Sequence, residues 1–322
     1  MSFPNLLGIK KLVLDTETTG LKANDLAFCF SVCWGPGPDE VLAFDLRKNP
    51  SAGRWLEDVV HENRPDIICH NASYDARMLL NAGISLPLEL FDCTVIRASL
   101  INEHERTVFP WRDLAPDAGY SLDYLARRYL SDIPGMGKTG DELYAKMAAI
   151  MGGTPTKSVQ MAQISHAPWH LVEPYAKQDA LVTWHLYHHQ EKEIHVQDLF
   201  QICAFERKVM PTLIRAEIRG IHVDVPYVEK AIGLLTVEID AQQEALYKAV
   251  GGDLNINSPL QVRELFKPTQ DDTGVWKTQC GVQLETTDTG HASIDAKALR
   301  SMKDPVAQQI VALREPKKTR DT

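Results

Sequence analysis

The sequence has no long apolar run: none of its hydrophobic stretches reaches the roughly 18 residues that a membrane-spanning helix requires. Its N-terminus lacks both the basic region and the apolar core of a secretory signal, so we expect a protein that is not exported. The six cysteines form no CxxC pair, which favours free thiols in a reducing compartment. Internal repeats and low-complexity tracts are missing too, so no repeat architecture is predicted.

Positive charge is in short supply as well. The 34 Lys and Arg residues are outnumbered by 43 Asp and Glu residues, which gives a formal net charge of −9. This balance argues against a strongly basic nucleic-acid coat protein. It leaves open an enzyme that acts on nucleic acid through metal ions, because acidic sites that hold divalent cations themselves lower the net charge.

A nucleoside triphosphate-binding loop is also missing. The stretch Gly135-Met-Gly-Lys-Thr139 looks like the end of such a loop, but the first glycine of the motif falls at position 132, which is Asp. We therefore interpret this stretch as a mobile loop without a phosphate-binding role.

What the chain does have is a regular succession of apolar elements. Its 322 residues, 44% of them hydrophobic, suffice for two soluble domains. Apolar runs predict five short strands, near residues 11–17, 26–33, 41–44, 66–69 and up to 91. Helical patterns cover residues 53–62, 73–82, 92–101, 121–130, 141–150, 172–194 and 200–219, with Pro174 in the first turn of its helix. This order predicts an α/β fold, a mixed sheet flanked by helices whose first three strands form an antiparallel meander.

The character of the sequence changes after Gly220, which is a helix-ending residue. Residues 221–224 look strand-like, and a long amphipathic helix is predicted from Tyr227 to about Val250. Ser258, followed by Pro and by Gln261, predicts a capped helix start with a capping box. We place a boundary near residues 206–220 and assign residues 1–205 to a first domain and residues 206–322 to a second, mainly helical region.

Two acids end the first predicted strand. Side chains two apart in a strand point to the same side, so Asp15 and Glu17 share one face with Val13, and Thr16 faces the other way. Two carboxylates held this close are costly unless a cation shares them. The pair alone is equally compatible with an ordinary acidic loop after a strand.

Two further acids lie beside predicted helices. Asp75 falls near the N-terminus of the helix after the fourth strand, where stabilising the helix dipole is an alternative role. Tyr175 and Asp179 are four residues apart on an otherwise apolar helix face, where an unpaired Asp is costly. The nearby histidines suggest zinc, but they fall past this face and are interpreted as solvent-side residues: His185, His188 and His189.

Four carboxylates without a compelling His or Cys ligand favour a hard divalent cation, Mg²⁺ or Mn²⁺. Two such ions about 4 Å apart suit in-line displacement at a phosphodiester, because one activates the attacking water and the other stabilises the leaving oxygen. The acids therefore predict a two-metal phosphodiesterase.

The same residues carry a family resemblance. Asp15-x-Glu17, Asn71-x-x-x-Asp75 and Tyr175-x-x-x-Asp179 resemble, in order and spacing, the three motifs of the DEDD-type 3′–5′ exonucleases, in the subclass with Tyr in its third motif (DEDDy). The resemblance implies a ribonuclease H-like fold and a catalytic set made of Asp15, Glu17, Asp75, Tyr175 and Asp179. It implies that Asp15, Glu17 and Asp179 bind one ion and that Asp15 bridges to the second, with Asp75 acting through its water shell. Tyr175 and Glu17 would orient the attacking water.

The resemblance also implies contacts with the nucleic acid. Leu21 matches the position where the family places an apolar side chain against the terminal base, although simple loop packing is an alternative. Asn71 and Tyr74 match positions near the terminal nucleotides, and Thr16 is assigned to the same nucleic-acid contacts. The expected partner is a single-stranded DNA 3′ end or a primer terminus.

The second half resembles another part of one polymerase family. Residues 206–224 resemble the helix that links exonuclease to polymerase in family A DNA polymerases, and residues 254–266 resemble the start of their thumb. Residues 287–293 and 310–314 resemble the segments after that part of the thumb. No palm or fingers motif is present, so we expect no polymerisation by this chain alone and a possible separate palm and fingers subunit.

The resemblance leads to a functional hypothesis with two alternatives. We expect a proofreading DNA 3′–5′ exonuclease in the cytoplasm of a bacterium or a phage-infected cell, with an organelle not excluded and no membrane association. One alternative is an RNA exonuclease with the same site, which the thumb-like segment argues against. The other is a non-catalytic DNA-binding subunit, which the intact set of four acids and Tyr175 argues against.

Overall fold

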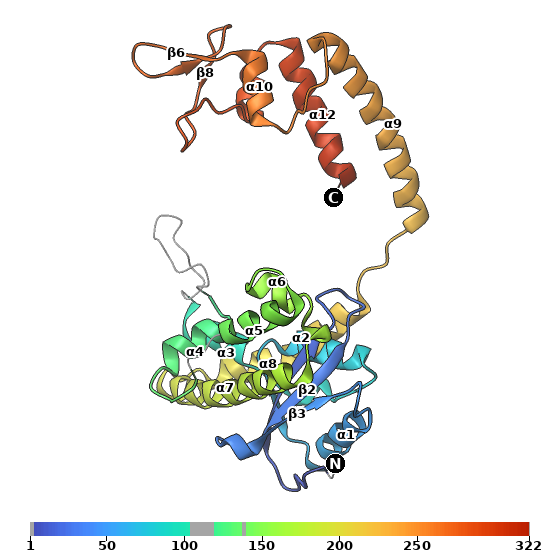
Figure 1. The fold of residues 1–322 in the computed structure, drawn as a ribbon, viewed down its shortest axis with the longest axis vertical. Coiled ribbons are helices and arrows are strands. Elements are labelled where there is room, and N and C mark those ends of the chain that lie inside the picture. Colours follow the sequence, from blue (N-terminus) through green and yellow to red (C-terminus); the bar gives the residue numbers. More distant parts are fainter. Residues whose placement is uncertain (1–2, 104–118, 137–139, 322) are drawn as a thin grey trace. The chain divides into compact units, whose positions relative to one another are not determined.

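The computed structural model describes residues 3–103, 119–136 and 140–321, and the chain divides into two compact units between Gly220 and Ile221 (Figure 1). The end of the phosphate-loop-like stretch, residues 137–139, lies outside the described residues. Within the described part of the chain, no helix is long and apolar enough to cross a membrane.

A mixed five-stranded sheet forms the centre of the first unit, which confirms the predicted fold class. Its strands are β1 (Lys11–Thr18), β2 (Ala27–Cys33), β3 (Val41–Asp45), β4 (Asp66–Cys69) and β5 (Phe91–Cys93), in the spatial order β3-β2-β1-β4-β5. Strand β2 is antiparallel to β1 and β3, because short loops join these strands into the predicted meander. Strands β4 and β5 run parallel to β1, since helical crossovers reach them.

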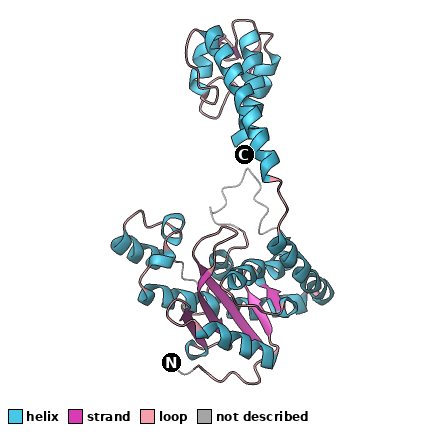
Figure 2. Ribbon diagram, turned by 90° about the vertical axis from the view of Figure 1, so that its right-hand side faces the viewer, coloured by secondary structure: helices cyan, strands magenta, loops and turns pink. Residues whose placement is uncertain are grey.

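Helices cover both faces of this sheet (Figure 2). Leu12 and Leu14 of β1 pack in one core with α1 (Ser51–Asn63), α2 (Ala72–Asn81) and α8 (Phe200–Arg219). Val13 faces the opposite side, where α7 (Trp169–Val196) packs. The remaining described helices of this unit are α3 (Thr94–Ile101), α4 (Leu122–Tyr129), α5 (Asp141–Met151) and α6 (Lys157–Met161). The alternation along β1 thus sends neighbouring side chains to two different cores.

Helix α7 starts earlier than the sequence pattern predicts. It begins at Trp169, directly after the extended Pro168, so Pro174 lies inside the helix in its second turn and the prediction of a first-turn position is wrong. Pro174 is exposed, so the missing backbone donor falls on the solvent side of the helix. The exposed position explains why a continuous helix tolerates it.

The start of α3 is also later than predicted. Asp92 and Cys93 belong to β5, and α3 begins at Thr94 rather than at Asp92. Asp92 is the strand partner of Ile68, and its carboxylate accepts from Arg97. Pairing with β4 therefore prevails over the local helical pattern at these two residues.

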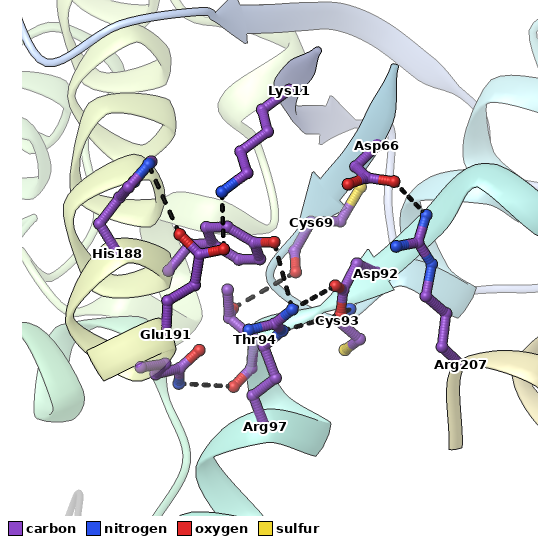
Figure 3. Close-up of polar contacts among 12 residues, drawn as sticks. Lys11, Asp66, Cys69, Asp92, Cys93, Thr94, Arg97, His188, Glu191 and Arg207 are labelled. Atoms are coloured by element: carbon purple, nitrogen blue, oxygen red, sulfur yellow. Dashed lines mark hydrogen bonds and ion pairs between the residues drawn. The ribbon is translucent and has the colours of Figure 1, made fainter. Parts of the chain in front are cut away.

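Polar contacts hold the second half of α7 to the sheet and to α3 (Figure 3). Gln190 donates to the Thr94 carbonyl at 2.8 Å, and Lys11 of β1 forms an ion pair with Glu191 at 2.6 Å. Arg97 bridges Asp92, at 2.6 Å, and the Tyr187 hydroxyl, at 3.2 Å. These contacts fix the C-terminal half of α7 in place, at a distance from its N-terminal half.

Helix α8 belongs to the first unit by its contacts. Met210 and Ile214 lie in the core beneath the sheet, and Arg207 forms an ion pair with Asp66 of β4 (Figure 3). The assignment of residues 206–322 to a second, polymerase-related region stays a prediction.

The second unit is mainly helical and has its own core. It contains α9 (Val225–Val250), α10 (Pro259–Phe266), α11 (Ala296–Ser301) and α12 (Pro305–Asp321), with a small sheet of β6 (Thr269–Gln270), β7 (Trp276–Lys277) and β8 (Gln283–Leu284). Its core includes Ile239, Leu246, Val262, Leu299 and Ile310.

The links that precede α9 and α10 differ from the sequence prediction in two details. Residues 221–224 form no strand; Ile221 is 92% exposed, and Asp224 instead caps α9 by accepting from the Tyr227 amide. Ser258 caps α10 as predicted. The Gln261 side chain accepts from the Asn255 amide, outside the expected capping box, because the preceding turn folds back over the helix start.

Replacing Arg97 by Leu tests the buried ion pair. We expect Arg97→Leu to lower the free energy of unfolding by about 3–5 kcal/mol, because Asp92 is then left buried and unpaired. Urea denaturation measures this change.

The control for this variant is Arg64→Leu. Arg64 pairs with Glu89 at 2.9 Å on the surface, where both side chains are more than half exposed. Loss of this surface pair should lower the free energy of unfolding by at most about 1 kcal/mol. Equal losses for the two variants would contradict a stabilising role of the buried pair.

Candidate metal centre and active site

Three carboxylates converge where the end of β1 meets α7. Asp15 and Glu17 share one face of β1, and Glu17 is only 5% exposed. Asp179 approaches from α7, and one oxygen of each carboxylate lies within 4.8 Å of the other two. Residues separated by more than 160 positions in sequence are thus brought into one potential ligand set.

Asp75 lies beside this group but is not part of the three-oxygen set. It sits in the first turn of α2, which begins just after β4, and it is 3% exposed. The Thr16 hydroxyl donates to Asp75 Oδ1 at 2.7 Å, whereas Oδ2 is buried with no partner among the described residues. A buried carboxylate oxygen without a donor is costly, so this atom fits a ligand or an ordered water.

All four acids have raised pKa values. Burial is the main reason why the pKa values of Asp15 and Glu17 lie well above their usual range, and repulsion from Asp75 and Asp179 adds to it. Burial likewise raises the pKa values of Asp75 and Asp179, each to about 7. A bound cation would attract each carboxylate and so offset this repulsion, which would favour the ionised forms.

Tyr175 lies one helical turn before Asp179. Burial and the nearby carboxylates hold the pKa of Tyr175 well above its usual range, so its hydroxyl stays protonated. That hydroxyl acts to lower the pKa of Asp179, although burial outweighs the effect. Tyr175 is therefore available as a neutral donor at the edge of the acidic group.

Two side chains near the acids have no counterpart in the sequence prediction. Tyr144 of α5 is 3% exposed; burial is the main reason why its pKa is raised, and the charges of Asp123, Asp179 and Glu17 add to the shift. Lys157, which pairs with Asp123 at 3.2 Å, exerts a lowering effect on the pKa of Glu17. In sequence, Tyr144 is only one member of an apolar helix stripe, and Lys157 lies in an irregular stretch.

The residues predicted to contact nucleic acid differ in their surroundings. Leu21 is 82% exposed on the loop between β1 and β2, and the Tyr74 hydroxyl donates to the Gly20 carbonyl of that loop at 3.0 Å. Asn71 is exposed and adopts a left-handed backbone conformation, with φ of 81°, before α2. The Thr16 side chain is buried and committed to Asp75.

The histidines of α7 stay outside the three-carboxylate group. His185 bonds the Pro36 carbonyl, His188 bonds the Trp184 carbonyl, and His189 stacks on Tyr129. The ligand set identified in the described part of the chain therefore consists of oxygen donors, which suit a hard divalent cation.

The raised pKa values predict a pH dependence of stability. Asp75 and Asp179 have a folded-state pKa of about 7 against an ordinary value of 3.8, so between these pH values the folded state holds more protons than the unfolded state. The free energy of unfolding of the metal-free protein should therefore fall as pH rises from about 4 to 7, by roughly 3 kcal/mol for each acid. Urea denaturation in the presence of a chelator measures this dependence.

Amide variants check the source of that dependence. Asp75→Asn and Asp179→Asn should each flatten the pH profile and stabilise the metal-free protein at pH 7. Asp58→Asn, on the exposed face of α1, should leave the profile unchanged. A wild-type profile that is flat between pH 4 and 7 would show that these acids titrate normally.

Comparison with known proteins identifies the family to which this chain belongs. Residues 3–195 match a family model described as 3′–5′ exonuclease, so the chain belongs to the 3′–5′ exonuclease domain family of family A DNA polymerases. The chain is 45% identical to DNA polymerase DpoZ of Vibrio phage phiVC8, over all of this chain and 50% of that protein. It is 35% identical to DNA polymerase DpoZ of Acinetobacter phage SH-Ab 15497, over all of this chain and 49% of that protein.

A solved structure shares the fold. It is the polymerase domain of Pol1 from M. smegmatis in complex with a DNA primer-template and dNTP, with a TM-score of 0.59, 20% sequence identity, and coverage of 98% of this chain and 46% of that one. The chain spans about half the length of the curated phage relatives that it matches. The predicted family resemblance is confirmed.

Proposed function

We propose that this protein removes nucleotides from DNA 3′ ends by metal-dependent hydrolysis of the terminal phosphodiester. The observation that carries the proposal is the convergence of Asp15, Glu17 and Asp179 within 4.8 Å at the end of the sheet. Membership of an exonuclease family supports the direction of attack, which the geometry alone does not give.

The acids suit two Mg²⁺ or Mn²⁺ ions. Asp15, Glu17 and Asp179 would hold one ion, and Asp15 would share the second with Asp75, which acts through coordinated water. Bound divalent ions supply charge stabilisation at the phosphate and lower the pKa of water. The unpartnered Asp75 Oδ2 and the raised pKa values of the acids support this assignment.

The protein's own groups would position the reactants. Glu17 and the neutral Tyr175 hydroxyl orient a water molecule toward the phosphorus atom. Attack by its oxygen forms a new P–O bond while the bond to the preceding 3′ oxygen breaks. The attacking water gives up one proton to solvent, and the released 3′ oxygen takes up one proton from solvent. The products are a nucleoside 5′-monophosphate and DNA shortened by one nucleotide. Orienting a reactant in this way contributes to rate by proximity.

The DNA terminus would lie beside the β1–β2 loop and the start of α2. Leu21 would contact the terminal base, with Asn71 and Tyr74 near the terminal nucleotides and Thr16 contributing through its main chain, since its hydroxyl is committed to Asp75. A proofreading role follows if a polymerase module acts on the same primer terminus, either in the same polypeptide or as a separate palm and fingers subunit. Similarity to phage DNA polymerases over half their length supports that partnership.

A double variant tests the metal site. Asp15→Ala with Glu17→Ala should abolish Mg²⁺-dependent loss of 3′ nucleotides from a single-stranded DNA oligonucleotide, because both ion positions lose a ligand. Gel analysis of 3′-end shortening measures the rate, and a chelator should stop the wild-type reaction.

The matched control is Asp58→Ala with Glu62→Ala, which removes two exposed acids of α1. This control should keep the wild-type rate. Unchanged activity in the Asp15 and Glu17 double variant would refute the proposed site. An RNA oligonucleotide of the same sequence tests the substrate class, and faster shortening of RNA than of DNA would favour the alternative RNA exonuclease.

Tyr175→Phe tests water positioning separately from metal binding. Loss of the hydroxyl should lower kcat on DNA by roughly 10- to 100-fold, because the attacking water is no longer held in place, while KM changes little. Tyr247→Phe in the second unit is the control and should leave kcat unaltered. Steady-state kinetics distinguish the two, and a Tyr175→Phe variant with wild-type kcat would remove this residue from the mechanism.

A further inference from the structure

An exposed apolar side chain sits next to the acidic group. Leu21 is 82% exposed on the loop of residues 19–26, which leaves β1 two residues after Glu17. Surface loops are ordinarily the more mobile parts of a fold. The loop of residues 19–26 is instead held by hydrogen bonds within itself and to helix α2.

Asp25 organises the loop from within. Its carboxylate accepts from the Thr19 hydroxyl at 3.0 Å and from the Lys22 amide at 2.6 Å. The Thr19 hydroxyl in turn accepts from the Leu26 amide at 3.1 Å. A Cβ atom at Gly20 would lie 2.5 Å from Asp25 Oδ2, so the chain closes tightly around this carboxylate.

Helix α2 fixes the loop from outside at two points. The Tyr74 hydroxyl donates to the Gly20 carbonyl at 3.0 Å. Two turns further along the same helix, the Asn81 amide nitrogen donates to the Ala23 carbonyl at 2.8 Å and to the Asp25 carbonyl at 2.6 Å. Tyr74 and Asn81 are seven residues apart and therefore lie on one face of α2, the helix that also carries Asp75.

We propose that Asn81 is a positioning residue that holds the loop of residues 19–26, and with it Leu21, against the DNA terminus. This inference rests on the proposed exonuclease function. An amide nitrogen offers two N–H donors to the two carbonyls, whereas a Leu of similar size offers none. Because Asn81 contacts only main-chain oxygens of the loop, it acts through Leu21 and not on the reacting phosphate.

Asn81→Leu should therefore weaken DNA binding without changing the chemistry. Loss of the two hydrogen bonds, which are made in an exposed loop, predicts a rise of roughly 10-fold in KM for single-stranded DNA, equivalent to about 1.4 kcal/mol. Hydrolysis of bis(p-nitrophenyl) phosphate, an ester that carries no base for Leu21 to contact, should stay within about twofold of wild type.

The chain offers a matched control at the end of another helix. Asn63 is the last residue of α1, donates to the Val59 carbonyl at 2.8 Å and accepts from the Gly8 amide of a different loop. Asn63→Leu should leave both substrates unaffected. If Asn81→Leu lowers activity on DNA and on the ester equally, the substitution has damaged the structure generally, and the proposal is overturned.

A double-mutant cycle tests whether Asn81 acts through Leu21. Leu21→Ala should raise KM for DNA on its own, and adding Asn81→Leu should change it by less than about twofold further, because the side chain to be positioned is already gone. Independent, multiplying effects of the two substitutions would overturn the proposal.

Amide hydrogen exchange separates this inference from the proposed function. The Lys22 and Leu26 amides are hydrogen-bonded within the loop, so their exchange should accelerate in Asn81→Leu and not in Asn63→Leu. Unchanged exchange would overturn the positioning role even in an active enzyme. Wild-type protein that hydrolyses neither DNA nor the ester would instead refute the proposed function.

Discussion

Repulsion among four neighbouring carboxylates, two of them buried and two half-buried, is the constraint on which the structure of the first unit depends. Two unit charges 4 Å apart repel by about 1 kcal/mol in water and by about 4 kcal/mol in surroundings typical of a protein surface. Burial raises the pKa of all four acids, and repulsion from Asp75 and Asp179 adds to the shift at Asp15 and Glu17. Folding must therefore bring together side chains that repel one another. The contacts that stabilise the unit consequently lie elsewhere in it.

Those contacts are made away from the acids. Helix α7 presents Asp179 from its first half, while its second half is fixed by the ion pair of Glu191 with Lys11 and by the Gln190 hydrogen bond to α3. Strand β1 is paired on both sides, with β2 and with β4. The elements that carry the acids are therefore held by contacts made elsewhere in the unit, and these contacts set the positions of the four side chains.

Much of this organisation could be predicted from short-range patterns. The alternation along β1 places Asp15 and Glu17 on one face, and the apolar stripe of α7 marks Asp179 as an acid facing the core. The features that these patterns could not predict depend on contacts between distant residues. Pairing with β4 keeps Asp92 in a strand, and the proximity of Tyr144 to the acids arises only from the packing of α5 on α7. The hydrogen bond from Thr16 to Asp75 joins residues 59 positions apart.

The opposite orientations of neighbouring side chains in β1 have a consequence for chain length. Thr16 reaches Asp75 on one side of the sheet, while Asp15 and Glu17 face α7 on the other. Insertion or deletion of one residue within this strand would exchange the two sides for every later position. Such a change would turn the carboxylates away from Asp179 while the sheet could still form. The strand is therefore far less tolerant of length variation than the turn between β2 and β3, where added residues would alter only a connection.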